Sequence, residues 1–243
     1  MARVKILFLD VGTHKAQELK ALNASVISLS VLYIKRALLS VISRHRYVPS
    51  LSAFCGFLVD RYKLFRKVSF TFVAIEPNWR HGSHIGKANV DHIFYCALTH
   101  ETSGIVELYH NASQQGLEGQ AATLVPNSLG SVKDPVLGID ALKFFAGLEG
   151  RFGREDFVVL RLNNEGFEDV VINAALEVFR NRVILILGSL DDVRKKFGDA
   201  RYREALGSLA SNNVGFIRFS PLMTSWPDAI SGLLQAADYK LNS

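Results

Sequence analysis

The sequence predicts an α/β protein with a mostly parallel central sheet and helices on both faces of that sheet. Apolar runs of strand length alternate with longer helical stretches, which is the pattern of parallel strands joined by crossover helices. The first run, Val4–Leu9, is apolar apart from Lys5, as expected of a strand that helices cover on both faces. The sequence has no internal repeat and no low-complexity linker, so residues 1–243 are expected to form a single domain.

After the first strand, the sequence predicts a helical segment and then three further strands. The helical segment is expected to break into two helices near Tyr47–Ser50, because proline disfavours helix in the residue before it. Ser69–Ile75 is the second expected strand. His92–Leu98 and Ile105–Tyr109 flank Thr102-Ser103-Gly104, which predicts a third strand joined by a turn to a hairpin partner.

The second half of the chain continues the alternation of strands and helices. Gly, Gln, Ser and Asn are frequent from Asn111 to Lys133, which predicts a mobile loop. The elements expected after this loop are a helix at Ile139–Leu148, a strand at Phe157–Leu162, a helix at Glu168–Phe179, a strand at Val183–Leu187, a charged helix at Asp191–Ala210, a strand at Val214–Phe219 and a helical tail after Trp226.

Composition excludes several classes of protein. Hydrophobic residues make up 49% of the chain and charged residues 21%, which excludes a mainly disordered, collagen-like or coiled-coil protein. Cys55 and Cys96 are too few for a disulfide framework, which favours a reducing compartment. Met1–Asp10 does not have the pattern of a signal peptide, and the uncharged run Ala21–Ile34 is too short to span a membrane. A cytoplasmic location is therefore expected.

The positive charge of the chain belongs to one segment, residues 20–67. Nine Lys and Arg residues and one acid, Asp60, give this segment a charge of +8, so the remaining residues sum to −3 of the total of +5. One interpretation is a buried helix at Val26–Ile42 with basic ends. The other is an insertion that contacts an anionic membrane surface or captures a lipid-linked or acidic glycan. Nucleic acid is not expected, because the aromatic residues of the segment have helical spacing that suits packing.

A glycine-containing turn follows the first predicted strand, in the sequence Asp10-Val11-Gly12-Thr13-His14-Lys15-Ala16. In open α/β sheets this edge binds ligands, because loop amides and the N-terminus of the next helix converge there. The turn is not a P-loop, and it lacks the full glycine fingerprint of a dinucleotide site, which disfavours a nicotinamide dehydrogenase. Taken alone, it is equally consistent with a purely structural turn.

Two further motifs follow later strands of the predicted sheet. Glu76-Pro77-Asn78 ends the strand Ser69–Ile75, where a carboxylate can accept hydrogen bonds from both hydroxyls of a ribose. The strand Phe157–Leu162 ends in Asn163-Asn164-Glu165-Gly166-Phe167-Glu168, a polar turn with a glycine before an acidic helix start. Acids in the first turn of a helix commonly serve only as partners of the helix dipole.

Taken in order, these motifs resemble the FkbM family of S-adenosylmethionine-dependent methyltransferases. The family's Asp-x-Gly-Ala-x-x-Gly turn is matched by Asp10–Ala16, and its Glu-Pro-Asn motif by Glu76–Asn78. An Ala-Leu step before a short hairpin is matched by Ala97-Leu98. The family's Lys-Ile-Asp-Ile-Glu-Gly-x-Glu sequence is matched by Arg161–Glu168. The resemblance extends from Ile6 to about Leu176 and leaves residues 20–67 unmatched.

The resemblance implies a Rossmann-like class I methyltransferase fold with a basic helical insertion at about 20–67. It implies S-adenosyl-L-methionine as cofactor and methyl transfer to a hydroxyl of a sugar, glycolipid or other small natural product. The cofactor-binding residues that it implies are Asp10, Gly12, Thr13, His14, Glu76, Pro77, Asn78 and Ala97. The residues that it places on the acceptor side, as candidates for catalysis, are Asn163, Glu165 and Glu168. No metal is expected.

The sequence departs from the family pattern at two positions that matter for chemistry. Ala16 replaces the second glycine of the turn. Alanine has a β-carbon and therefore suits a negative backbone φ better than a positive one. Asn163 stands where the family has Asp, and an amide can hold a hydroxyl but cannot take its proton. The base would then be Glu165, Glu168 or a histidine. These two departures, together with Arg161, favour an alternative function, that of a catalytically degenerate methyltransferase fold that acts as a binding or scaffold module, with residues 20–67 as its contact surface.

Overall fold

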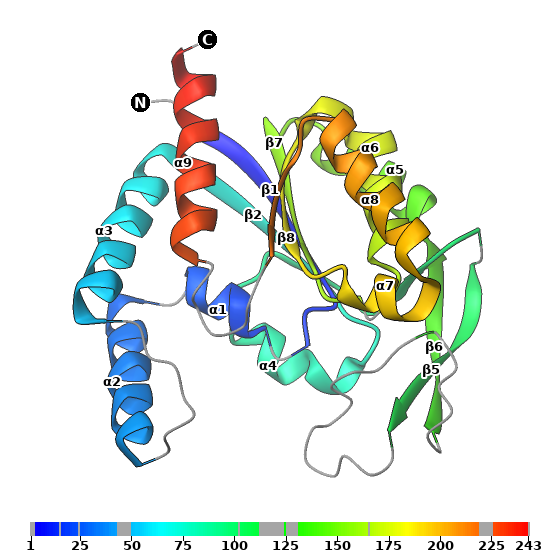
Figure 1. Ribbon diagram of the computed structural model, residues 1–243, viewed down its shortest axis with the longest axis horizontal. Coiled ribbons are helices and arrows are strands. Elements are labelled where there is room, and N and C mark those ends of the chain that lie inside the picture. The colour runs from blue at the N-terminus through cyan, green and yellow to red at the C-terminus, as the bar shows by residue number, and fades with distance from the viewer. Residues whose placement is uncertain are drawn as a thin grey trace.

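The computed structural model describes residues 3–14, 16–23, 25–42, 50–101, 103–111, 124, 131–164, 166–218 and 226–242. These residues form an α/β protein with a six-stranded, all-parallel sheet and a small mixed sheet of three strands (Figure 1). The expectation of a mostly parallel central sheet is confirmed.

The central sheet has the strand order β3-β2-β1-β7-β8-β9. Its strands are β1 (Val4–Val11), β2 (Val68–Ile75), β3 (His92–Phe94), β7 (Phe157–Leu162), β8 (Val183–Gly188) and β9 (Gly215–Arg218). The chain builds outward from β1 in one direction through β2 and β3, and then returns to the other side of β1 with β7. The order therefore reverses between β1 and β7, and ligands of open α/β sheets bind outside the carboxyl ends of the strands at such a switch point.

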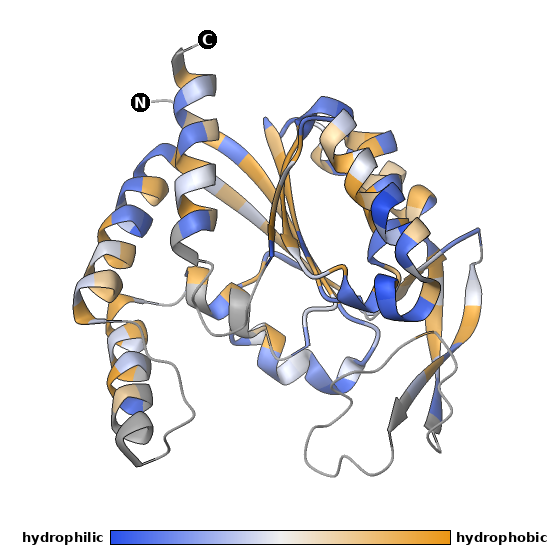
Figure 2. Ribbon diagram, in the orientation of Figure 1, coloured by the Kyte–Doolittle hydropathy of each residue, from blue (hydrophilic) through white to orange (hydrophobic). Residues whose placement is uncertain are grey.

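Helices cover both faces of the central sheet (Figure 1). On one face lie α1 (Gln17–Asn23), α2 (Val26–Ile42), α3 (Leu51–Lys67) and α9 (Trp226–Asn242), and on the other α5 (Ala141–Phe152), α6 (Glu168–Phe179), α7 (Asp191–Phe197) and α8 (Asp199–Ser211). The alternation of side chains along β1 feeds both cores: Leu7 and Leu9 pack toward α5 and α6, whereas Ile6 and Phe8 pack toward α3 and α9. The central strands are accordingly strongly hydrophobic (Figure 2).

The small sheet corrects one prediction for the middle of the chain. Its order is β4-β6-β5, with β4 at Ala97–Thr99, β5 at Gly104–Asn111 and β6 at Ser131–Asp140. The expected hairpin between His92–Leu98 and Ile105–Tyr109 is wrong, because β5 pairs antiparallel with β6, and β6 pairs parallel with β4. The strand expected at His92–Leu98 is divided between the two sheets, as β3 and β4. The loop predicted for 111–133 ends in β6; residues 112–123 and 125–130 lie outside the described part.

Two predicted helices are divided differently in the structure. The helical segment after β1 contains three helices, α1, α2 and α3, and the break expected near Tyr47–Ser50 falls mainly on residues 43–49, outside the described part. The charged helix expected at Asp191–Ala210 is two helices, separated at Gly198, whose φ is +87°. Beyond these, η1 (Trp79–His81) and α4 (Gly82–Gly86) follow β2, and η2 (Arg180–Arg182) follows α6. Among the helices in the described residues, none has the length and apolarity needed to cross a bilayer.

Candidate functional site at the carboxyl ends of β1, β2 and β7

The polar motifs singled out in the sequence meet at one edge of the central sheet. Strand β1 pairs with β2 on one side and with β7 on the other, so the three strand ends are neighbours. Side chains two residues apart on a strand point to the same face, and Phe8 and Val159 belong to the core beside α3 and α9. Asp10 and Arg161 follow them by two residues and so point to that face.

A buried ion pair joins β1 and β7. Asp10 and Arg161 are direct neighbours in the strand register, and the Arg161 Nη1 lies 3.1 Å from Asp10 Oδ1. The same Nη1 donates to the carbonyl oxygen of Gly12 at 2.7 Å. The side chain of Arg161 is 7% exposed and that of Asp10 is 0% exposed, so the ion pair is shielded from solvent.

The Glu76 carboxylate closes the turn of β1 onto the end of β2. Its Oε2 accepts the backbone N–H of His14 at 2.7 Å, and its Oε1 accepts the N–H of Asn78 at 2.9 Å. Burial raises the pKa of Glu76 to about 7 even though these two hydrogen bonds favour the charged form. The carboxyl therefore titrates near neutral pH, and its remaining lone pairs can accept hydrogen bonds from hydroxyl groups.

Gly12 is required where the turns after β1 and β7 touch. Its φ is +73°, and a β-carbon added to it would lie 2.1 Å from the carbonyl oxygen of Asn163. Both the backbone conformation and the close approach exclude a side chain at this position. The two turns are thus pressed together, with Asn163 N donating to Val11 O at 2.9 Å.

His14 is a largely buried, neutral imidazole beside these turns. The pKa of His14 is lowered to about 4, mainly by burial, with smaller contributions from the nearby charges of Arg161 and His81. The ring makes a hydrogen bond with the backbone of Asn163, and its Nδ1 is buried without a hydrogen-bond partner among the described residues. A neutral imidazole that donates through Nε2 carries its free lone pair on Nδ1, so this atom can accept a proton or a hydrogen bond.

A small crevice lies between these groups. Six residues predicted to belong to the site line the crevice: Gly12, His14, Glu76, Pro77, Ala97 and Asn163. Three residues that were not predicted as site residues also line it: Leu108, Leu124 and Asn164. Asn164 Nδ2 is a second buried polar atom without a hydrogen-bond partner in the described part of the chain. The volume of the crevice is about 20 Å³, which is room for about one water molecule.

Other predicted site residues serve the architecture of the turns. The Thr13 hydroxyl donates to Asp10 O at 2.7 Å, and Asn78 Oδ1 accepts the N–H of Arg80 at the start of η1. The Glu168 carboxylate accepts the N–H groups of Asn164 and Gly166 at 3.0 and 2.8 Å and is 2% exposed. Glu168 therefore holds the turn after β7 in shape. Glu165 lies outside the described residues.

Ala16 adopts the conformation that its replacement of glycine makes costly. Its φ is +53°, in the left-handed region, where a residue with a β-carbon costs about 1–2 kcal/mol relative to glycine. The negative φ that would suit alanine is therefore not what the structure has. Ala16 is fully buried in the core beside α3 and α9, so its methyl group packs there.

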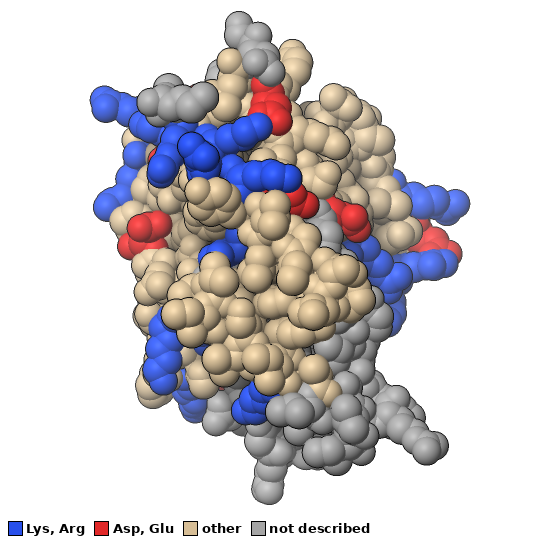
Figure 3. All heavy atoms as spheres, turned by 90° about the vertical axis from the view of Figure 1, so that its left-hand side faces the viewer, with Lys and Arg blue, Asp and Glu red and all other residues tan. Residues whose placement is uncertain are grey.

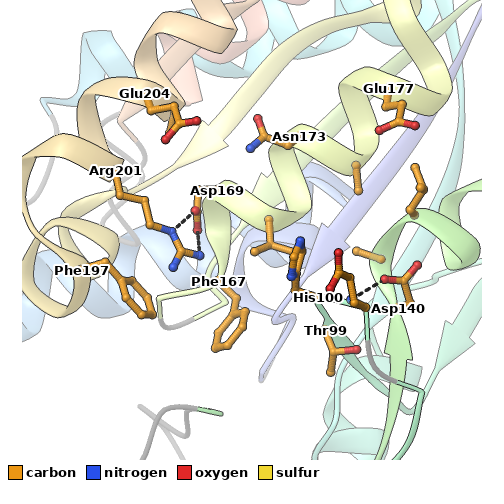
Figure 4. Close-up of a pocket in the computed structure, with 16 residues that line it drawn as sticks. Thr99, His100, Asp140, Phe167, Asp169, Asn173, Glu177, Phe197, Arg201 and Glu204 are labelled. Atoms are coloured by element: carbon orange, nitrogen blue, oxygen red, sulfur yellow. Dashed lines mark hydrogen bonds and ion pairs between the residues drawn. The ribbon is translucent and has the colours of Figure 1, made fainter.

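A much larger groove lies beyond the turn after β7, between α6 and α8 on one side and β4 and α5 on the other (Figure 4). Its volume is about 640 Å³, and a second hollow of about 360 Å³ shares Thr99, His100 and Phe167 with it. Arg201 of α8 forms a two-pronged ion pair with Asp169 of α6 on one side of the groove, with Nη2 and Oδ1 3.1 Å apart. Three exposed carboxylates line the groove without an ion pair to any described residue: Glu101, Glu177 and Glu204.

The sequence could have revealed Arg161 but not the groove. Arg161 and Asp10 each lie near the end of a strand predicted to be parallel, so opposite charges at matching heights are a signal of pairing. The groove brings together residues from β4, α6 and α8, and no local pattern connects them.

The chain was also compared with protein-family models, with curated proteins and with solved structures. No match was found in any of the three. The chemistry of the site therefore rests on its own geometry.

Proposed function

We propose that the chain is an S-adenosylmethionine-dependent O-methyltransferase whose cofactor binds at the carboxyl ends of β1 and β2. The observation that carries the proposal is the placement of Glu76 beside the Gly12 turn, next to the point where the strand order reverses. In the FkbM family, which the motifs resemble, these positions belong to the cofactor site. The acceptor would be a hydroxyl of a sugar, glycolipid or other small natural product.

The donor and acceptor groups at the crevice suit such a cofactor, although the crevice does not yet have room for it. Glu76 can accept hydrogen bonds from the ribose hydroxyls, and Asn164 Nδ2 is a buried donor that lacks a partner among the described residues. A volume of about 20 Å³ is far below that of a nucleoside, so binding requires the crevice to widen. When bound, S-adenosylmethionine supplies a methyl group that passes from its sulfonium sulfur to the acceptor oxygen.

The residues of the turn after β7 can hold the acceptor hydroxyl, and a different group must take its proton. Asn163 has no basic site, and both oxygens of Glu168 accept backbone N–H groups. Glu76 is assigned to the ribose hydroxyls, so among the other described residues that line the crevice His14 offers a free lone pair, on Nδ1. We therefore assign the general base to His14. His14→Asn, which tolerates the positive φ of this position, is expected to abolish methyl transfer and to leave cofactor binding in place.

The groove between α6 and α8 supplies a surface for the rest of the acceptor. It joins the hollow that Leu124 also lines, and Leu124 is one of the residues at the crevice. The ring of Phe167 can pack against the apolar face of a sugar. Hydrogen bonds from the sugar's hydroxyl groups can be accepted by the carboxylates of Glu101, Glu177 and Glu204. This surface suits a hydroxyl-rich acceptor larger than the crevice itself.

A second candidate is a non-catalytic binding or scaffold protein with a methyltransferase-like fold. Three observations favour it: the crevice holds about 20 Å³, Asp10 is committed to a buried ion pair with Arg161, and Ala16 has a positive φ where the family has glycine. The small volume and the buried ion pair suit a closed edge of the sheet, and Ala16 departs from the glycine expected in a cofactor-binding turn.

Calorimetric titration with S-adenosylmethionine and S-adenosylhomocysteine separates the two candidates. The enzyme is expected to bind both ligands in the micromolar range. Glu76→Gln is expected to weaken binding about 10- to 100-fold, because a charged acceptor of ribose hydroxyls is lost. Glu101→Gln is the matched control, since it changes an exposed carboxylate in the groove and should leave the affinity unchanged.

The absence of heat and of any shift in melting temperature with both ligands would discard the methyltransferase proposal in favour of the scaffold. Equal binding by the parent and Glu76→Gln would place the cofactor elsewhere on the molecule.

A further inference from the structure

Helix α2 exposes an apolar stripe to solvent. Ile27, Val31 and Ile34 follow one another at helical spacing and are 77%, 61% and 56% exposed. The opposite side of the helix already packs on the domain, since Leu29 is buried and the ring of Tyr33 stacks on Phe54 at 4.3 Å between centroids. The exposed stripe is therefore additional apolar surface that the fold itself does not use.

Helix α3 carries a second stripe of the same kind. Leu51, Val59 and Tyr62 are 65%, 52% and 65% exposed and share one side of the helix with the exposed Cys55. The inner side of α3 is satisfied by the buried residues Phe54, Phe57 and Leu64. Of the fifteen exposed large hydrophobic residues among the described positions, seven lie between 26 and 62. Such a concentration marks an interaction surface rather than ordinary surface scatter.

Basic residues border this apolar surface. Lys35 follows Ile34 on α2, and Arg66 continues the exposed side of α3 one turn beyond Tyr62, with its guanidinium 6.0 Å from that ring. Lys63 and Lys67 lie nearby in ion pairs with Asp60 and Asp238. Seen from this side, the molecule presents a broad area without charged groups, with Lys and Arg gathered next to it (Figure 3). We call the exposed sides of α2 and α3, with Lys35 and Arg66, the α2–α3 face.

We propose that the α2–α3 face binds the surface of an anionic lipid bilayer. Apolar side chains can enter the boundary between headgroups and acyl chains, while the neighbouring Lys and Arg side chains contact anionic headgroups.

Charge favours a membrane over a second copy of the chain. The α2–α3 face presents the basic residues Lys35 and Arg66, and a two-fold symmetric dimer would bring two such faces together. Like charges across that interface would repel each other, whereas an anionic bilayer attracts them. The proposal does not depend on methyltransferase activity, because the α2–α3 face lies outside the crevice residues.

Flotation of the full chain with vesicles tests the proposal. The protein is expected to float with phosphatidylcholine vesicles that contain phosphatidylserine at low salt. It should stay behind with pure phosphatidylcholine, and high salt should weaken the binding. The triple variant Ile27→Ser/Val31→Ser/Ile34→Ser and the double variant Lys35→Glu/Arg66→Glu are each expected to lower vesicle partitioning about tenfold or more.

Matched variants on other surfaces make the test specific. Ile105→Ser/Leu137→Ser removes exposed apolar side chains from the small sheet, and Arg154→Glu/Arg203→Glu reverses two exposed charges outside α2 and α3. Both should bind vesicles like the parent. Absence of vesicle binding at low salt would overturn the proposal, as would equal binding by all four variants. A dimer in light scattering that the triple serine variant converts to a monomer would assign the face to a second copy instead.

Discussion

The two hollows of the molecule differ in how they use their polar groups. Beside the crevice, the charged side chains of Asp10, Arg161 and Glu76 are bound to other parts of the protein, and a volume of about 20 Å³ remains. In the groove between α6 and α8, the volume is about 640 Å³, and several exposed carboxylates lack ion pairs with described residues. The crevice therefore contributes to the stability of the fold, whereas the groove is available to a ligand at little structural cost.

Removing Arg161 is expected to be the most damaging single change among those considered. Arg161→Met leaves the fully buried Asp10 carboxylate without its ionic partner, and breaking a buried ion pair costs about 3–5 kcal/mol of unfolding free energy. Urea denaturation measures the loss. The double variant Arg161→Met/Asp10→Leu should recover much of it, because no buried charge is then left unpaired. Losses that simply add in the double variant would show that the two side chains are not coupled. The exposed Arg154→Met is the control, with an expected change below about 0.5 kcal/mol.

Glu76 is expected to make stability depend on pH with a definite sign. Because its pKa rises from 4.5 to about 7 on folding, the native state binds more protons than the unfolded state between these values. This group therefore lowers the unfolding free energy as pH rises through that window, by up to about 3 kcal/mol.

His14 acts in the opposite direction, since its pKa falls from 6.5 to about 4, so the unfolded state binds more protons in that range.

The difference between the parent and Glu76→Gln in urea denaturation from pH 4.5 to 8 isolates the contribution of Glu76. The variant should gain in stability relative to the parent as pH rises. A constant difference across the range would show that folding does not raise the pKa of Glu76, and Glu101→Gln supplies the baseline.

The smallest expected effect belongs to the groove. Arg201→Gln removes an ion pair in which Arg201 is 33% and Asp169 8% exposed. Asp169 then stays buried without this partner, but it lies in the first turn of α6, where the helix dipole stabilises its charge. We expect a loss of about 1–2 kcal/mol in the free energy of unfolding. Lys195→Gln, which breaks a surface pair with Asp192, should cost less than that. A loss for Arg201→Gln as large as that for Arg161→Met would contradict the distinction between the two hollows.

The strands and helices that the sequence predicted best are those with the clearest local signals. The strand Phe157–Leu162 and the helix Glu168–Phe179 have the expected bounds, because an apolar run and an acidic helix start mark them directly. Strand β6 was missed, since Ser131–Asp140 contains Pro135 and Gly138 and lacks a sustained apolar pattern. Its place is set by pairing with β4 and β5, which is a tertiary effect.

The candidate site was predictable in its location but not in its shape. The strand-end motifs contain Gly12, Glu76 and Asn163, and these three residues line one crevice in the structure. The internal role of Glu168 and the positive φ of Ala16 depend on the course of the backbone in the turns, which residue types alone do not determine. For the same reason the sequence did not reveal how little space the crevice contains.

The contact between Gly12 and Asn163 determines which part of the crevice can yield. The turn of β1 is pressed against that of β7, and hydrogen bonds of Gly12 N to Ile75 O and of His14 N to Glu76 tie it to β2. The turns after β1, β2 and β7 are thus joined into one unit, and this unit carries the polar groups of the crevice. Leu108 and Ala97, on the far side, belong to the small sheet. A ligand could therefore enlarge the crevice only by displacing the small sheet. The polar groups on the turns after β1, β2 and β7 would determine which ligand binds.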